Sequence, residues 1–543
     1  MSSFWLDRVV AEARPRARNK TRLVVRDEKT ASGRIHVGSL RGVVIHGAVS
    51  RALSEAKLPS AFFYEINDFD PFDDIPSFLN REEFERHLGK PLFAVPAPDL
   101  PAPAGALRAD GQAGGTPENY AEYFGGEFIA VIKRLGFAAE FYRASALYRE
   151  GRMNDAIRIA LLRAPLIARI YEEVSGAKRE KNWLPVSLVC EHCGKIGTTK
   201  ALSFDGERVK YECGNFVEWA VGCGRGGAMS PYNGGAKLLW KAEWAAKFFV
   251  LGVDVEGAGK DHSTKGGARE IADRIAREVY GIEPPVNIPY EFFHVGGRKM
   301  STSRGAGASA REIAELLPPK LLRFLMLYKD PARVIDFDPS ADTIPNLYDT
   351  YDSYAEEFWK GGAGDYAKIF RFSHPRADAR GLGERFLPRF SEVAYLVQMP
   401  HLEFLKEIEK MAGRSLMAED KQEAEERAFY ARRWLESCAP EKYKFEIQKA
   451  LPAAAKALRE EQRKALARVR ALLEANPMAD GQTLHGKLHE LKTELGIAPK
   501  DFFSALYLSL LGKESGPKAG WFLSVLDRDF LLKRLREASL DST

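Results

Sequence analysis

The sequence contains no long apolar run and no hydrophobic segment near its N-terminus. No stretch of eighteen apolar residues occurs in the 543 residues, so we do not expect a transmembrane helix. The opening residues, MSSFWLDRVVAEARPRARNK, lack the apolar centre that a secretory signal peptide requires. We therefore expect no membrane association and a cytoplasmic location.

The sequence is also poor in cysteine. Five cysteines in 543 residues do not make a disulfide framework. Four of them fall between Cys190 and Cys223, whereas Cys438 stands alone, so we expect one local cluster. The net charge of +5 is too small to identify a nucleic-acid-binding protein. The hydrophobic fraction of 45% and the charged fraction of 29% are typical of a globular protein.

A strand–helix–strand pattern opens the chain. Residues 22–26 (RLVVR) predict a short buried strand, and VVIHGAVSRALSEAK has the apolar spacing of a helix. The next segment, AFFYEIND, predicts a second strand. A crossover of this kind implies a parallel sheet, whose ligands bind at the carboxyl ends of the strands. Residues 30–39, between the first strand and the helix, are therefore expected at a binding crevice.

The rest of the chain divides into four parts. Residues 93–115 are rich in Pro, Ala and Gly and predict a long surface loop. Helical patterns run over residues 117–177 and precede the cysteine segment. Strand and helix alternation returns near Trp244, so the nucleotide-type fold is expected in two halves separated by about 140 residues. From about Asp338 nearly everything has helical period.

Two segments have the chemistry of a phosphate site. His36 stands beside Gly38 at a predicted helix N-terminus, where free backbone N–H groups and the helix dipole favour negative charge. The segment Lys299–Gly305 (KMSTSRG) offers cations and hydroxyls that suit charge growing on a leaving pyrophosphate. Taken alone, the first segment also fits an ordinary turn and the second a basic surface loop.

Together, about 263 residues apart, the two segments resemble the HIGH and KMSKS signatures of class I aminoacyl-tRNA synthetases. Further segments within about the first 330 residues resemble the class I lysyl-tRNA synthetases, among them FYEINDFDPFDDIP, LLWKAEWAAKFFVLGVDVEGAGKDHSTKGG and NIPYEFFHVGGRKMSTS. Two positions depart from the signatures: Ser39 replaces the usual His, and Thr302 replaces the usual second Lys, with Arg304 as the alternative cation. The resemblance implies activation of lysine with ATP and Mg²⁺, then transfer to the terminal ribose of tRNA(Lys).

The resemblance also implies roles for individual residues. The predicted catalytic residues are His36, Gly38, Ser39, Lys299, Ser301, Ser303 and Arg304. The residues expected to bind ATP are Ser32, Gly33, Gly257, Gly259 and Asp261. The residues expected to line the lysine pocket are Thr30, Trp240, His262 and Tyr290. The acid that meets the lysine ammonium is left open among Glu243, Glu65 and Asp68. Trp240 and Trp244 would supply an apolar wall, although Trp at this spacing also fits a simple core.

We therefore predict an α/β fold. A Rossmann-type parallel-sheet catalytic domain is split by an insertion that contains the cysteine knuckle, and an all-α C-terminal anticodon-binding domain follows. The expected parts are residues 1–95 (first half of the catalytic domain), 96–235 (connective insertion), 236–310 (second half), 311–360 (linker helices) and 361–543 (anticodon-binding domain).

The cysteine cluster predicts a structural Zn²⁺ site. Cys190 and Cys193 form a C-x-x-C knuckle, and Cys213 and Cys223 complete a set of four. Tetrahedral coordination by four thiolates would stabilise a small β-rich insert that has little core of its own. The spacing of the second pair is irregular for a zinc ribbon. The alternative is four reduced cysteines that pack as small hydrophobic side chains.

A basic stretch near the C-terminus is the candidate tRNA-binding surface. Residues 441–470 contain nine Lys/Arg and four Glu and look helical. A solvated helix face is the alternative interpretation. The side chains expected along the RNA backbone are Lys442, Lys444, Lys449, Lys456, Arg459, Arg463, Lys464, Arg468 and Arg470. Trp434, Tyr443 and Phe445 are expected to stack on unpaired bases.

Three other functions remain open at this point. The chain could be a class I synthetase for another amino acid, such as glutamate or cysteine, although the lysyl-type segments disfavour this. A small-molecule nucleotidyltransferase shares the phosphate chemistry but needs no long helical tail. A synthetase-like RNA-binding protein without ligase activity would not need both signatures. We expect a monomer.

Overall fold

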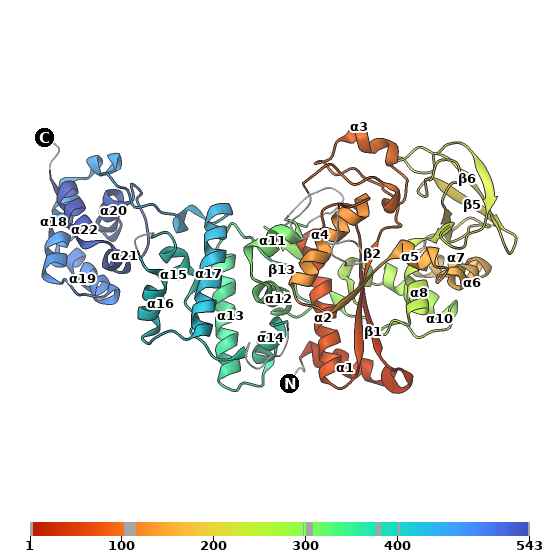
Figure 1. The fold of residues 1–543 in the computed structure, drawn as a ribbon, viewed down its shortest axis with the longest axis horizontal. Helices are drawn as coiled ribbons and strands as arrows, with labels where there is room; N and C mark the ends of the chain where they lie inside the picture. Colours follow the sequence, from red (N-terminus) through yellow and green to blue (C-terminus); the bar gives the residue numbers. More distant parts are fainter. Residues whose placement is uncertain are drawn as a thin grey trace. The chain divides into compact units, whose positions relative to one another are not determined.

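The computed structural model describes residues 4–101, 116–296, 298–299, 308–375, 382–399 and 402–540, with the backbone alone at 298 and 299. The chain forms two compact units (Figure 1). Unit 1 comprises Met1–Phe337 and Ser353–Gly383, and unit 2 comprises Asp338–Asp352 and Glu384–Thr543. In the described part of the chain, no helix combines the length and apolar character that crossing a bilayer requires.

A parallel sheet forms the centre of unit 1. Its strands, in the order β1-β2-β3, are β1 (Leu23–Thr30), β2 (Ser60–Asn67) and β3 (Ala139–Arg143). Single parallel bridges join Val25 to Val255 and Val255 to Val286, so two later segments extend the sheet beyond β1. The predicted Rossmann-type sheet, built from two halves that are distant in sequence, is confirmed.

Helices cover both faces of this sheet. The crossover from β1 to β2 is α2 (Leu40–Glu55), and its Leu, Val and Ile side chains are buried. On the other side of β1 lie α8 (Trp240–Leu251) and α10 (Ala268–Glu278) (Figure 1). Because successive residues of a strand face opposite sides, Asp27 lies toward α2 whereas Glu28 lies toward α8.

The helical prediction for residues 117–177 is wrong at one point. The helical pattern predicted over residues 117–177 is confirmed for α4 (Tyr120–Arg134), α5 (Ala144–Arg149), α6 (Asn154–Leu162) and α7 (Ala164–Ser175). Residues 139–143 form β3 instead and pair with β2 in parallel. This strand is only partly buried, so it lacks the apolar run that identifies a central strand in a sequence.

The cysteine-containing insertion is β-rich, as expected. An antiparallel three-stranded sheet consists of β5 (Thr199–Phe204), β6 (Val209–Cys213) and β7 (Gly226–Met229). Beside it, β4 (Val186–Leu188) pairs with β8 (Ala236–Leu238), which leads directly into α8. The remaining elements of unit 1 are α1 (Trp5–Ala13), α3 (Arg81–Phe84), β9 (Ala258–Gly259), α9 (Lys260–Ser263), β10 (Pro289–Tyr290), β11 (Phe293–Val295), β12 (Arg298–Lys299), α11 (Ala310–Leu316), α12 (Pro319–Leu327), β13 (Ile335–Asp336) and α14 (Asp365–Ser373).

Unit 2 is helical where it is described, as predicted. Its helices are α13 (Thr343–Trp359, which continues into unit 1), α15 (Phe390–Leu396), α16 (Phe404–Ala412), α17 (Ala418–Ser437), α18 (Glu460–Ala475), α19 (Gly481–Glu494), α20 (Pro499–Leu510), α21 (Ala519–Val525) and α22 (Arg528–Ser539). The helical prediction for residues 441–470 is wrong in its first half. Only short 3-10 turns occur before α18, because Pro440 and Pro452 interrupt the helix.

Candidate active site

A cavity of about 340 Å³ lies at the carboxyl end of β1, where a parallel sheet of this kind binds its ligands. Five separate chain segments line it. The lining residues are Asp27, Glu28, Lys29, His36, Gly38, Ser39, Trp240, Trp244, Glu256, Gly257, Ala258, Gly259, Asp261, His262, Tyr290, Glu291, Phe292 and Phe293. The structure thus brings together nine of the predicted site residues: His36, Gly38, Ser39, Gly257, Gly259, Asp261, Trp240, His262 and Tyr290.

The N-terminus of α2 faces this cavity. His36 is extended and is followed by a 3-10 turn, Val37–Ser39, that leads into α2. Backbone N–H groups at such an end have no partner within the helix and favour an anion. His36 also pairs with Ser309 across an antiparallel bridge, and the Val37 N–H donates to the Ala308 carbonyl at 3.1 Å.

Of the predicted segment Lys299–Gly305, the structure describes only the backbone of Lys299. The backbone of Lys299 pairs with His294, next to Phe293 in the cavity wall. On the other side, Ser309 pairs with His36. The side chain of Lys299 and residues Ser301, Ser303 and Arg304 lie outside the described residues. Lys299 and Ser309, the nearest described residues on the two sides, therefore pair with residues in or next to the cavity wall.

An aromatic wall closes one side of the cavity. The rings of Trp240 and Trp244 are stacked, with centroids 6.2 Å apart and planes 12° apart, and His262 meets Trp240 edge-on at 5.1 Å. Trp244 is buried and its Nε1 donates to Glu256 at 2.6 Å, whereas Trp240 is 43% exposed. Trp244 is therefore a core residue, and Trp240 presents an open aromatic face.

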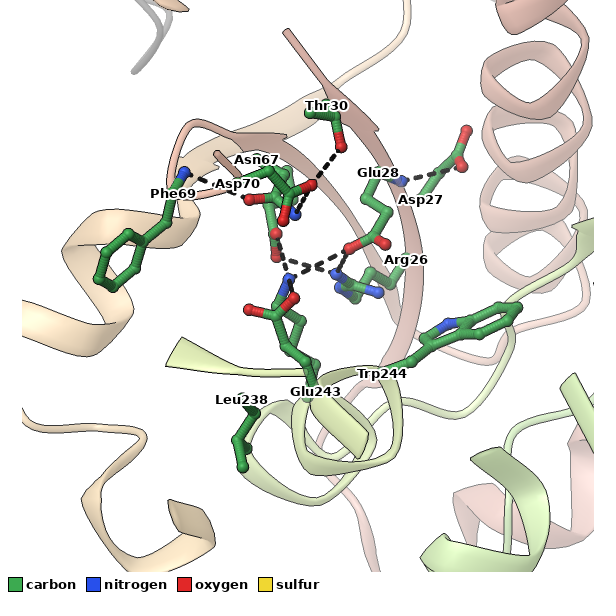
Figure 2. A network of polar contacts seen from close by, with 12 residues as sticks. Arg26, Asp27, Glu28, Thr30, Asn67, Phe69, Asp70, Leu238, Glu243 and Trp244 are labelled. Atoms are coloured by element: carbon green, nitrogen blue, oxygen red, sulfur yellow. Dashed lines mark hydrogen bonds and ion pairs between the residues drawn. The ribbon is translucent and has the colours of Figure 1, made fainter. Parts of the chain in front are cut away.

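A buried network of charged groups lies behind this wall (Figure 2). It consists of the cations Arg26, Lys237 and Lys247 and the carboxylates Glu28, Glu65, Glu243, Glu256 and Asp70. Arg26 contacts Glu28, Glu65 and Glu256, all three from β1 or its neighbours in the sheet. Burial raises the pKa of the Glu28 carboxyl, but Lys247 and Arg26 outweigh burial and hold that pKa well below its usual range. Glu28 is therefore ionised.

Three predicted residues do not line the cavity. The hydroxyl of Thr30 donates to Asp70 at 2.7 Å, behind the aromatic wall. The carbonyl of Ser32 accepts a hydrogen bond from the Tyr120 hydroxyl at 3.0 Å, and Gly33 follows it in the same turn. These residues shape the loop between β1 and α2 and do not face the cavity.

The acids that the sequence suggested are not at the cavity surface. Glu243 and Glu65 are buried in the charged network, and Asp68 is buried against Ser145, whose N–H donates to it at 2.8 Å. Sequence reasoning missed the acids that do line the cavity, which are Asp27, Glu28, Glu256 and Glu291, together with the cation Lys29. The change from apolar RLVV to charged RDEK along β1 was the available signal for three of them.

The four clustered cysteines have the geometry of a tetrahedral metal site. Their sulfur atoms all lie within 4.8 Å of one another. Sγ of Cys190 is 3.7 Å from that of Cys223, and Sγ of Cys193 is 3.7 Å from that of Cys213. A tetrahedron with metal–sulfur bonds of about 2.3 Å has edges of about 3.8 Å. The set therefore fits Zn²⁺ despite the irregular spacing of the second pair.

The proposed RNA-binding side chains of unit 2 are only partly available. Trp434 is fully buried, donates to the Pro339 carbonyl at 2.9 Å and packs against Phe390, so the expectation that it stacks on bases is wrong. Tyr443 and Phe445 are partly exposed. Six of the nine basic side chains form ion pairs with nearby acids: Lys442, Lys444, Arg459, Lys464, Arg468 and Arg470.

Comparisons with known proteins agree with this geometry. The family model of class I (K) tRNA synthetases matches residues 3–375, and that of an anticodon binding domain matches residues 384–539. A lysine–tRNA ligase of Methanosarcina acetivorans is 36% identical over 530 residues, which cover 94% of each chain. A lysine–tRNA ligase of Archaeoglobus fulgidus is 32% identical over 98% of this chain and 99% of that one. A solved glutamate tRNA ligase from Elizabethkingia meningosepticum is 12% identical over 95% of this chain and 99% of that one, with a TM-score of 0.42. Because one family model covers more than half of the residues and full-length relatives exceed 30% identity, the chain belongs to the class I (K) tRNA synthetases.

Proposed function

We propose that this chain is a lysine–tRNA ligase, which activates lysine with ATP and transfers it to the 3′ end of tRNA(Lys). The observation that supports this best is one cavity that combines a helix N-terminus, an open aromatic face and several carboxylates. The full-length similarity to lysine–tRNA ligases supports the same activity.

In this proposal ATP binds between α2 and the loop that follows Val255. The N-terminus of α2 and His36 hold the phosphates, because backbone N–H groups and an imidazole can donate to phosphate oxygens. Gly257 and Gly259 allow the adenosine to approach the backbone closely, and Asp261 binds it from the same loop. Ser32 and Gly33 would contribute indirectly, by shaping the loop between β1 and α2 that leads to His36.

The segment Lys299–Gly305 would close over the phosphates. Lys299 pairs with His294 beside the cavity wall and Ser309 pairs with His36, which suits a segment whose cations neutralise the leaving pyrophosphate. We assign Lys299 and Arg304 as this cationic pair, with the hydroxyls of Ser301 and Ser303 as further donors. Mg²⁺ is usually held by substrate phosphates and one or two carboxylates, and Asp261 or Glu291 would supply such a ligand here.

The amino acid would bind along the aromatic wall. The methylenes of lysine pack on the exposed face of Trp240, with His262 and Tyr290 beside it. The lysine carboxylate then attacks the α-phosphorus of ATP and displaces pyrophosphate, which gives lysyl-adenylate. A ribose hydroxyl of the tRNA attacks the carbonyl of the adenylate and releases AMP. The chain positions the reactants and stabilises charge, and it forms no covalent intermediate.

Two further parts of the proposal lie outside the cavity. The four cysteines would hold a structural Zn²⁺ that stabilises the β-rich insertion. Unit 2 would bind the anticodon arm, with basic side chains near the RNA backbone such as Lys449 and Lys456, which form no ion pair with any described residue. The monomeric state and the cytoplasmic location stay predictions.

Pyrophosphate exchange tests this function. Purified full-length protein is incubated with ATP, labelled pyrophosphate and each of the twenty amino acids in turn. We expect exchange with lysine alone, and lysylated tRNA when tRNA(Lys) is added. Exchange with a different amino acid would identify a synthetase of other specificity. Binding of tRNA without exchange for any amino acid would identify an RNA-binding protein and refute the proposal.

A further inference from the structure

The charged network behind the aromatic wall has an excess of negative charge. It contains three cations and five carboxylates, so with every group ionised it carries two more negative than positive charges. Six of these groups have side chains that are at most 6% exposed. The two more open members are Asp70, 26% exposed, and Glu28, 22% exposed, and of these two Glu28 lines the cavity. Uncompensated charge in a low-dielectric site favours the binding of an opposite charge.

We infer that Glu28 binds the side-chain ammonium of the substrate lysine and selects lysine over uncharged amino acids of the same length. This inference rests on the proposed function and names the acid of the amino-acid pocket. Glu28 is none of the three acids that the sequence suggested. Figure 2 shows Glu28 on β1 pointing toward α8, the helix that carries Trp244 and Glu243.

The contacts of Glu28 leave one oxygen for a ligand. Arg26 donates to Oε2 of Glu28, and Nζ of Lys247 lies 3.3 Å from the same oxygen. Within the described part of the chain, no hydrogen bond or ion pair uses Oε1. A carboxylate can accept about four hydrogen bonds, so Oε1 has the capacity to accept from an ammonium. The two cations behind Oε2 keep the group ionised and fixed in place.

Four other acids line the cavity. Asp261 is assigned to the adenosine in the proposed function, and the remaining three are less suited to binding the ammonium. Glu256 accepts both Arg26 NH1 contacts at 2.9 Å and the Trp244 Nε1 hydrogen at 2.6 Å. Glu291 already pairs with Lys260 at 2.6 Å. Asp27 accepts the backbone N–H of Glu28 at 2.9 Å and lies toward α2, where the ATP phosphates are proposed to bind.

Glu28 is also connected to the aromatic wall. Trp244 in the aromatic wall is linked to Glu28 through Glu256 and Arg26, so the wall and the acid belong to one network. The methylenes of the substrate would pack on the wall while its ammonium reaches the acid. A site built to bind a charged group rejects an analogue that lacks it, because the oxygen that should accept from the ammonium then loses water without gaining a hydrogen bond.

The test compares lysine with norleucine, which has the same carbon chain without the ammonium. Amino-acid-dependent pyrophosphate exchange is measured for wild-type protein, Glu28→Gln and the control Glu140→Gln. Glu140 is an acid of β3 in the same sheet, 55% exposed and paired with Arg22 at 3.1 Å, and it does not line the cavity.

We expect Glu28→Gln to raise the KM for lysine by about tenfold or more and to leave the KM for ATP within about twofold. The ratio of kcat/KM for lysine over norleucine should fall by about tenfold, and Glu140→Gln should change none of these values. Equal losses for lysine and norleucine, or an unchanged lysine KM, would overturn the inference and leave the proposed function intact. Wild-type protein that does not activate lysine would refute both.

A second variant covers the case in which Glu28→Gln fails to fold because Arg26 loses a charged partner. Glu28→Asp keeps the charge beside Arg26 and shortens the side chain by one methylene. It should raise the lysine KM severalfold and leave the values for norleucine and ATP unchanged. A lysine KM equal to that of wild type in a folded Glu28→Asp variant would overturn the inference as well.

Discussion

The backbone N–H of Gly257 donates a hydrogen bond of 2.7 Å to Nε2 of His46, which is fully buried in α2. Because Nε2 accepts this hydrogen bond, the proton of the neutral ring is on Nδ1, which lies 2.7 Å from the Gly42 carbonyl. The contact joins two segments that are 211 residues apart, one from each half of the sheet. It fixes the loop after Val255 against the helix whose N-terminus faces the cavity.

Gly257 should not tolerate a side chain. A Cβ at this position would lie 2.5 Å from the carbonyl oxygen of Ile288, so the backbone would have to move. We expect Gly257→Ala to lower lysine-dependent exchange by about tenfold or more, mainly through a higher KM for ATP. Gly486→Ala in α19 is the control, since no atom lies within 4 Å of the added Cβ. That control should keep full activity, and equal activity of both variants would show that the loop is free to adjust.

The two tryptophans of the wall should respond differently to truncation. Trp240 is 43% exposed, so Trp240→Ala should raise the KM for lysine with little effect on thermal stability. Trp244 is buried, and Trp244→Ala should destabilise unit 1 by about 3–5 kcal/mol. Thermal melts and exchange kinetics of the two variants separate these effects. A large loss of stability in Trp240→Ala would show that this residue is part of the core.

Metal content checks the cysteine cluster. We expect about one zinc per chain in the purified protein, measured by mass spectrometry of the metals. Cys193→Ser should lose the zinc and melt at a lower temperature, because the β-rich insertion depends on the metal for its stability. Cys438→Ser changes the one cysteine outside the cluster, so this variant should retain the zinc and the wild-type melting temperature. Wild-type protein without metal, equally stable in the presence of a chelator, would instead support four reduced thiols.

Asp420 makes unit 2 sensitive to acid. Its buried carboxylate accepts hydrogen bonds from Arg414, Phe386 N–H and Met417 N–H, and its pKa is lowered to about 2, chiefly by Arg414. Because the pKa is lower in the folded than in the unfolded chain, the carboxylate stabilises the fold at neutral pH. This contribution is about 2 kcal/mol and is lost as the pH falls from about 4 to about 2.

Unfolding of wild-type protein and Asp420→Asn in urea at several pH values tests this prediction. The difference in the free energy of unfolding should be constant above about pH 5 and should shrink below about pH 4. A difference that does not depend on pH would mean that the side chain acts through its shape and hydrogen bonds alone.

Local patterns were sufficient to predict the framework of the fold. The apolar run of β1, the helical spacing of α2 and the alternation in β2 are properties of contiguous residues, and all three elements were expected. The strand β3 was missed because it is short and partly buried, and its assignment depends on pairing with β2. Residues 441–470 look helical in composition, but prolines interrupt the helix.

The site was harder to predict than the fold. The first signature segment pointed to His36, and the family resemblance pointed to Gly257, Gly259 and Asp261 in the loop after Val255. All four residues line the cavity. The role of Glu28 depends on Arg26 from its own strand and Lys247 from a distant helix, and spacing along the sequence does not reveal such a network. Trp434 illustrates the converse, since an aromatic residue near basic ones is packed against Phe390 inside unit 2.

Each of the two units consists of two separate stretches of sequence, and this determines where the chain can be divided. Arg323 in α12 is fully buried and donates to the Phe372 carbonyl at 2.9 Å, so a fragment that ends at Phe337 would lose a partner of that guanidinium. A fragment that begins at Glu384 would lack Asp352, which pairs with the buried Arg427. Neither unit corresponds to one uninterrupted stretch of sequence. Deletion at a single boundary would therefore yield an unstable fragment. To express one unit alone, its two stretches of sequence would have to be joined directly: 1–337 to 353–383 for unit 1, or 338–352 to 384–543 for unit 2.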